Sequence, residues 1–187
     1  MSKSIAALVF AGLVFTAPAL AQDLGLSEIR GGVFVHSADE PGDLFGVFSV
    51  ERMQDINVEL LFDVPGMSSW LAWGELRPHL GATVNFQGLE SMVYGGVSWT
   101  VPIADSPVFV EASFGGALHN GNTQGNAVYP ARNLGCGLVF RESVSLGVKL
   151  NDNASIMATA EHASNANLCD NGNRGLTNMG IRFGYRF

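Results

Sequence analysis

The chain ends in Asn178-Met179-Gly180-Ile181-Arg182-Phe183-Gly184-Tyr185-Arg186-Phe187, where apolar residues alternate with asparagine, glycine and arginine. Successive side chains of a β-strand point to opposite faces, so this stretch predicts a strand with one apolar and one polar face. Arginine and glycine suit a narrow polar lumen, whereas the aromatic residues suit contact with lipid. The stretch therefore predicts one strand of a transmembrane β-barrel with its apolar face outward.

Similar alternation recurs upstream and predicts an all-β fold, an eight-stranded antiparallel transmembrane β-barrel of the outer membrane. The expected strands are Glu28 to His36, Ile56 to Asp63, Leu76 to Phe86, Ser91 to Val101, Val108 to His119, Leu134 to Leu150, Ser155 to Ser164 and Asn178 to Phe187. The even count places both ends in the periplasm. Short turns are then expected on the periplasmic side and longer loops outside, among them Asn120 to Asn133 and Asn165 to Thr177.

One connection departs from this pattern. Val64 to Glu75 is long for a periplasmic turn, and it carries Trp70, Leu71 and Trp73. Tryptophan is enriched where a membrane meets water. We therefore expect a short interfacial segment here.

The N-terminus indicates export. Residues 1–21 begin with Lys3, continue as an apolar run and end in Ala19-Leu20-Ala21, which is typical of a cleaved signal peptide. We expect residues 22–187 to form a single β-barrel domain in the outer membrane of a Gram-negative cell. The formal net charge of -7 argues against a nucleic-acid partner.

The two cysteines of an exported chain suggest a disulfide, with two separate thiols as the alternative. If the turn at Asn151 to Asn153 is centred on Asp152, the numbers of paired residues in the flanking strands sum to 304. Cys136 then falls opposite Leu168, next to Cys169. This register predicts that Cys136 and Cys169 lie near each other.

The candidate chemistry lies at the outer end of the seventh strand. His162 and Ser164 are two residues apart, so their side chains leave the same face, which is the apolar one. A serine nucleophile needs a base within hydrogen-bond reach, and imidazole is the usual one. The same register places Glu142 opposite His162 and Phe140 opposite Ser164. Alone, a His-x-Ser pair is a weak motif, because a histidine at the end of a strand is more often a rim residue.

Glu161 to Phe187 resembles the PagL family of outer-membrane lipid A 3-O-deacylases, which are acyloxyacyl hydrolase-like proteins. The resemblance rests on His162-x-Ser164-Asn165-Ala166, on Asn173-Arg174-Gly175-Leu176 and on Gly180-x-Arg182-x-Gly184-Tyr185-x-Phe187. Weaker similarity extends over most of the chain after residue 21.

The resemblance implies a carboxylic ester hydrolase that acts on lipid A, with its Ser-His-acid triad on the outer surface of the barrel. It implies Ser164 as nucleophile, His162 as base and Asn165 as a contributor to the oxyanion site. The acidic residue of the family falls at Thr177 in this sequence, and threonine carries no charge. Glu142, or Asp170 in the outer loop, could replace it, and the register favours Glu142.

Two other functions remain open at this stage. One is a non-catalytic structural barrel in which His162 and Ser164 are rim residues. The other is a soluble, lipocalin-like binding barrel with an apolar interior. The expected partners are lipid A or lipopolysaccharide and outer-membrane lipids, and homodimerisation is left open. The histidine spacing fits no zinc pattern, so no metal and no cofactor is expected.

Overall fold

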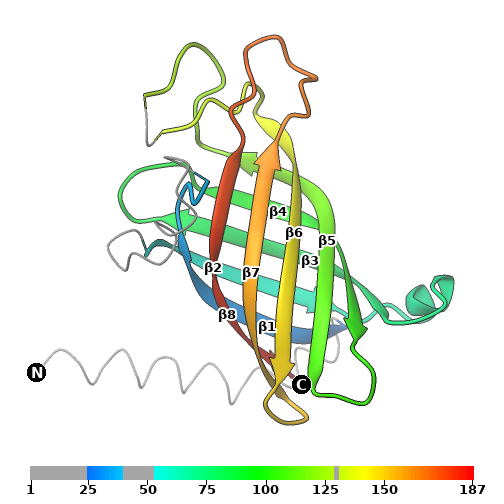
Figure 1. Cartoon of the computed structure of the whole chain (residues 1–187). Helices are drawn as coiled ribbons and strands as arrows, with labels where there is room; N and C mark the ends of the chain where they lie inside the picture. Colours follow the sequence, from blue (N-terminus) through cyan, green and yellow to red (C-terminus); the bar gives the residue numbers. More distant parts are fainter. Residues whose placement is uncertain (1–24, 40–52, 129–130) are drawn as a thin grey trace, which may run out of the picture.

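The computed structural model describes residues 25–39, 53–128 and 131–187. Within them the chain forms a closed barrel of strands that follow one another in chain order (Figure 1). The strands are β1 Leu26–Val35, β2 Met53–Phe62, β3 Glu75–Asn85, β4 Met92–Pro102, β5 Val108–His119, β6 Leu138–Lys149, β7 Ala154–Ser164 and β8 Leu176–Arg186, with a 3-10 helix, η3, at Met67–Trp70. The predicted eight-stranded antiparallel barrel is confirmed. The predicted signal peptide, residues 1–21, lies outside the described residues.

The strand boundaries agree with the predicted ones to within four residues. The largest difference is at β6, which starts at Leu138 and not at Leu134. Gly135 has a left-handed backbone with a φ of 72°, which interrupts extended structure. Residues 134–137 therefore belong to the outer loop.

The two faces of β8 are as predicted. The Arg182 side chain is fully buried inside the barrel, whereas Ile181 and Phe183 are each 50% exposed on the outside. A soluble lipocalin-like barrel would have the opposite arrangement, so that alternative is wrong. In the part of the chain that the structure describes, no helix is long and apolar enough to cross a membrane.

The interior is a packed polar core. Arg30, Arg141 and Arg182 are each at most 1% exposed. Glu59 accepts hydrogen bonds from Arg30 at 3.1 Å and from Arg182 at 2.9 Å. Arg141 donates to Glu161 at 2.8 Å. Buried charges are tolerated only when they are paired and hydrogen-bonded, and here these arginines and carboxylates satisfy one another.

A second polar cluster lies at the outer mouth of the barrel. The His36 ring lies between two carboxylates, 2.9 Å from Asp55 and 3.1 Å from Glu90. Burial alone would lower the pKa of His36, but hydrogen bonds to these carboxylates raise it to about 9. Glu90 also accepts a hydrogen bond from the main-chain N–H of Arg132 in the loop between β5 and β6. This cluster ties that outer loop to the barrel wall.

The pairing of β6 with β7 has the predicted register. Phe140 pairs with Ser164 and Glu142 with His162, and each pair of numbers sums to 304. Cys136 and Cys169 form a disulfide, with their Cα atoms 6.1 Å apart. The disulfide prediction is therefore confirmed.

Candidate active site

Polar side chains form a row on the outer, lipid-facing wall of the barrel. Glu142 of β6 pairs with His162 of β7, and His162 pairs with Thr177 of β8. Ser164 lies one step further out on β7, opposite Phe140. Side chains that are paired directly across antiparallel strands have Cβ atoms about 4.5 to 5.5 Å apart. The barrel thus brings all the sequence-predicted polar candidates on these three strands to one patch.

The imidazole of His162 has a defined orientation. Its Nδ1 lies 2.8 Å from the hydroxyl oxygen of Thr177. The hydroxyl can accept the Nδ1–H, which leaves the lone pair on Nε2. The backbone of Gly175 lies close to the edge of the imidazole ring. A Cβ at this position would lie 2.5 Å from Cε1 and 2.8 Å from Nε2 of His162, which is too close. Any other residue at position 175 would therefore displace the ring.

Other members of the patch are not hydrogen-bonded to the histidine. Across residues 25–39, 53–128 and 131–187, no hydrogen bond joins His162 to Ser164 or to Glu142. Glu142 is exposed, whereas His162 and Ser164 are partly buried. The Ser164 hydroxyl and the Glu142 carboxylate are thus accessible from the outer surface.

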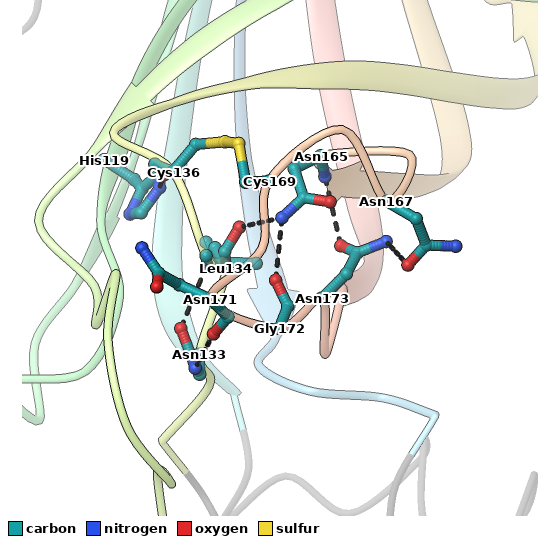
Figure 2. Close-up of a disulfide and its surroundings, with 11 residues drawn as sticks. His119, Asn133, Leu134, Cys136, Asn165, Asn167, Cys169, Asn171, Gly172 and Asn173 are labelled. Atoms are coloured by element: carbon teal, nitrogen blue, oxygen red, sulfur yellow. Dashed lines mark hydrogen bonds between the residues drawn. A yellow bond between two sulfur atoms is a disulfide. The ribbon is translucent and has the colours of Figure 1, made fainter.

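The residue after the serine is held firmly. Asn165 is only 2% exposed, and its side-chain amide donates to the carbonyl oxygens of Leu134 at 2.9 Å and Gly172 at 2.8 Å (Figure 2). Its main-chain N–H donates to the Asn173 side chain at 3.1 Å. Both amide hydrogens of Asn165 are therefore engaged with loop carbonyls.

The turn beyond Asn165 has an uncommon backbone. Ala166 and Asn167 both have positive φ angles, of 52° and 59°. Their main-chain N–H groups make no hydrogen bond with any residue that the structure describes. Two free donors therefore follow Ser164 within three residues.

Two outer loops are joined into one unit beside this turn (Figure 2). Besides the Cys136–Cys169 disulfide, the Asn133 side chain donates to the Asn171 carbonyl at 2.7 Å. The Arg174 main-chain N–H donates back to the Asn133 carbonyl at 2.8 Å. Asn133 and its contacts were not predicted, because loop residues have no periodicity from which a partner can be inferred.

A hollow of about 430 Å³ lies on the outer wall, lined in part by Phe140, the strand partner of Ser164. Gly115 and Gly116 contribute no side-chain bulk, and the Phe114 and Phe140 rings stack beside them with centroids 5.8 Å apart. The remaining lining residues are Cys136, Leu138, Val139, Asn165, Leu168 and Cys169. The size is in the range of small-molecule sites, and the lining is almost wholly apolar. Its occupant is therefore expected to be hydrocarbon.

A closed barrel with an apolar outer wall, a charged and filled interior and long loops at one end is a small outer-membrane β-barrel. Residues 55–186 match the family model for lipid A 3-O-deacylase (PagL). The chain therefore belongs to the PagL family, and the predicted resemblance is confirmed.

Solved structures show the same fold. The crystal structure of the outer membrane enzyme PagL is 19% identical over 86% of this chain and 100% of that chain, with a TM-score of 0.60. The N-terminal β-barrel domain of Pseudomonas aeruginosa OprF is 10% identical over 87% of this chain and 98% of that chain, with a TM-score of 0.55. None of the curated proteins compared with the chain matches it. At these identities the structural likeness concerns the barrel fold alone.

Proposed function

We propose that this protein is a lipid A 3-O-deacylase that hydrolyses an ester-linked acyl chain of lipid A at the membrane-facing outer rim. Ser164 is the nucleophile and His162 the general base. The observation that carries the proposal is the row of Glu142, His162 and Thr177 with Ser164 on a wall that is otherwise apolar. Polar side chains facing lipid are unfavourable, so their presence there indicates function.

In the first half of the reaction, the Ser164 oxygen attacks the ester carbonyl carbon and its proton passes to Nε2 of His162. The tetrahedral intermediate collapses, the bond from carbonyl carbon to sugar oxygen breaks, and the imidazolium protonates that oxygen. In the second half, water attacks the acyl-serine and His162 takes its proton. Free fatty acid leaves, and Ser164 regains its proton.

The imidazolium needs a partner that orients it and one that offsets its charge. Thr177 supplies the orientation through its bond to Nδ1, but a hydroxyl supplies no negative charge. Glu142 is paired directly with His162 across the strands, and we assign the charge compensation to it. Because Glu142 is not hydrogen-bonded to the ring, this compensation is weaker than that of a carboxylate bonded directly to Nδ1.

Asn165 contributes to the oxyanion site by holding the turn after Ser164. Its side-chain amide already donates to two carbonyls. The main-chain N–H groups of Ala166 and Asn167 are the free donors in that turn, and we assign the oxyanion contacts to them. A preorganised donor of this kind stabilises the transition state by roughly 3 to 4 kcal/mol.

The apolar hollow supports a lipid substrate. Phe140 pairs with Ser164 and also lines the hollow, so hydrocarbon lying there has its ester end beside the nucleophile. The acyl chain then stays out of water throughout the reaction. This arrangement explains why the serine faces lipid and not the polar interior.

The test is mass spectrometry of lipid A from outer membranes that carry the wild-type chain, the S164A variant or no copy. We expect loss of one ester-linked acyl chain with the wild type alone. Heat-modifiable migration in electrophoresis confirms that both proteins have folded. Equal deacylation by S164A would refute the role of the serine.

A non-catalytic structural barrel is the second candidate, and one observation favours it. Thr177 occupies the position of the acid in the family, and His162 is hydrogen-bonded to it and not to Ser164. This candidate predicts identical lipid A in all three membranes while the wild-type protein is folded.

A further inference from the structure

The connection between β2 and β3 is built as a surface feature. From residue 64 to residue 74 the chain carries no charged residue. Trp70 is 77% exposed and Trp73 is 63% exposed, and Val64 adjoins them at 47%. Figure 1 shows the segment, which includes η3, projecting sideways from the barrel at the end opposite the long loops. A segment of this size with such exposed tryptophans is uncommon on a surface that meets only water.

The segment holds one conformation through its own contacts. The main-chain N–H groups of Met67, Ser69 and Leu71 each donate to a carbonyl three residues earlier. The Ser68 hydroxyl accepts a hydrogen bond from the Leu76 N–H at 3.1 Å. The apolar side chains are therefore presented by a backbone that is folded by these local hydrogen bonds and tied to the start of β3.

Trp99 of β4 joins the segment to the barrel wall. Its indole N–H donates to the Trp73 carbonyl at 3.0 Å, and the two rings pack edge to face with centroids 5.6 Å apart. Gly74 permits this approach, since a Cβ there would lie 2.7 Å from the indole nitrogen of Trp99. The chain has three tryptophans in all, so every one of them belongs to this group.

The base of the segment is charged, in contrast to its exposed surface. Arg186 forms ion pairs with Glu75 at 2.8 Å and with Asp63 at 3.7 Å. Asp63 and Glu75 flank the uncharged stretch, and Arg186 of β8 bridges them at the periplasmic rim. The rim is thus charged, and the surface beside it is uncharged and carries tryptophan. This arrangement suits the membrane boundary, where charged headgroups adjoin acyl chains.

We propose that residues 64–74 dock into the periplasmic leaflet of the outer membrane, with Trp70 and Trp73 at the boundary between phospholipid headgroups and acyl chains. The surface is continuous with the lipid-facing wall of β3 and β4, where Leu80 and Val97 are exposed. Since β3 and β7 lie on opposite sides of the eight-stranded ring, the segment anchors the wall across from β7 and fixes the tilt of the barrel.

Depth-dependent fluorescence quenching tests the proposal on the full chain. In the W73F/W99F variant all tryptophan emission comes from Trp70. The protein is reconstituted in phosphatidylcholine vesicles with bromine at a shallow or a deep acyl position, and aqueous acrylamide is added separately. We expect strong quenching by the shallow bromolipid, weaker quenching by the deep one and little by acrylamide.

The matched control moves the single tryptophan to the opposite end of the molecule. Val128 lies in an outer loop and is 82% exposed, so in W70F/W73F/W99F/V128W the probe should be quenched by acrylamide and not by bromolipid. Heat-modifiable migration shows which variants have folded, and W73Y/W99Y provides a milder background with the same single tryptophan if W73F/W99F does not fold.

Two outcomes would overturn the proposal. Trp70 could behave as the probe at position 128 does, which would place the segment in water. Alternatively, Trp70 could be protected from both quenchers until the protein is diluted with excess lipid, which would assign the surface to contact between two copies of the chain.

Discussion

Two pairs of serine and histidine lie on opposite sides of the barrel wall. Inside, the Ser98 hydroxyl lies 3.0 Å from Nδ1 of His79, and both residues are at most 2% exposed. Outside, His162 and Ser164 are not hydrogen-bonded to each other, but both are open to the membrane-facing surface. Judged by the hydrogen bond alone, the interior pair is the better catalytic pair.

The accessibility and the surroundings of the two pairs favour the exterior pair instead. The interior pair is buried in a polar core in which Glu59 forms ion pairs with both Arg141 and Arg182, so the pair is closed off from the lipid outside. The exterior pair lies beside an apolar hollow and two free N–H groups. Polar groups inside therefore stabilise the fold, whereas we propose that the polar groups outside perform chemistry.

The sharpest test of this contrast replaces one serine at a time. We expect S164A to lower the deacylation rate by about a thousandfold or more, because a nucleophile has no substitute. Its free energy of unfolding should change by less than about 0.5 kcal/mol. S98A is the matched control and should keep its activity while losing about 1 kcal/mol of stability. Rates on purified lipid A and unfolding in denaturant measure both effects, and an inactive but folded S98A would break the contrast.

The next largest effect should come from the interior carboxylate Glu59. E59A leaves Arg30 and Arg182 without a shared partner and should destabilise the barrel by about 3 to 5 kcal/mol. V58A, on the outer face of the same strand, is the control and should cost much less. Unfolding by denaturant in micelles measures the free energy of unfolding of each variant. If E59A does not fold, E59Q keeps the shape and still removes the charge.

Removing the disulfide should affect both stability and rate. The loop-entropy relation for a bridge that spans 33 residues gives about 3 to 4 kcal/mol. C136S/C169S should also deacylate about tenfold more slowly, because the loop that holds Asn165 loses its covalent tie to the loop between β5 and β6. N171A is the control, since Asn171 takes part through its main-chain carbonyl. Unchanged kcat in the folded double variant would show that the hydrogen bonds suffice.

Changes at Thr177 test how the histidine is assisted. T177V removes the bond to Nδ1 and should slow the reaction about three- to tenfold. T177E supplies a carboxylate at that position and should accelerate it about tenfold, because a charged partner stabilises imidazolium. M179E adds a carboxylate further along the same face and should give no acceleration. Steady-state deacylation rates of the folded variants show whether a charged partner at position 177 assists His162.

The smallest effect should follow removal of the Glu142 charge. E142Q keeps the shape of the side chain, and we expect a rate about two- to fivefold lower, as for an exposed ion pair. In the T177E background E142Q should have no effect, since the imidazolium then has a closer partner. A drop of several hundredfold would instead make Glu142 the essential acid.

Much of the fold could be predicted because its signals are local. The alternation at Asn178 to Phe187 assigned inner and outer faces correctly, and the short turn around Asp152 set the pairing of Glu142 with His162. The same pairing brought Cys136 near Cys169. Each of these inferences needed only the two-residue period and one tight turn.

Other features of the site could not be predicted in this way. The bond between His162 and Thr177 depends on rotamers, and the close approach of Gly175 to the ring depends on the path of a loop. Asn133 was overlooked because nothing local connects it to Asn171, 38 residues later. Loop partners follow from closure of the whole barrel and not from sequence spacing.

By itself, the sequence determined which residues face lipid, which face the lumen and which strand carries the histidine and serine, because strand period and turn length act over a few residues. Only the tertiary structure decided which pair of serine and histidine is accessible. Closing the sheet encloses His79 and Ser98 among paired charges, and it leaves His162 and Ser164 on the outer wall. Accessibility is a property of the closed barrel, since every strand contributes to what its interior contains.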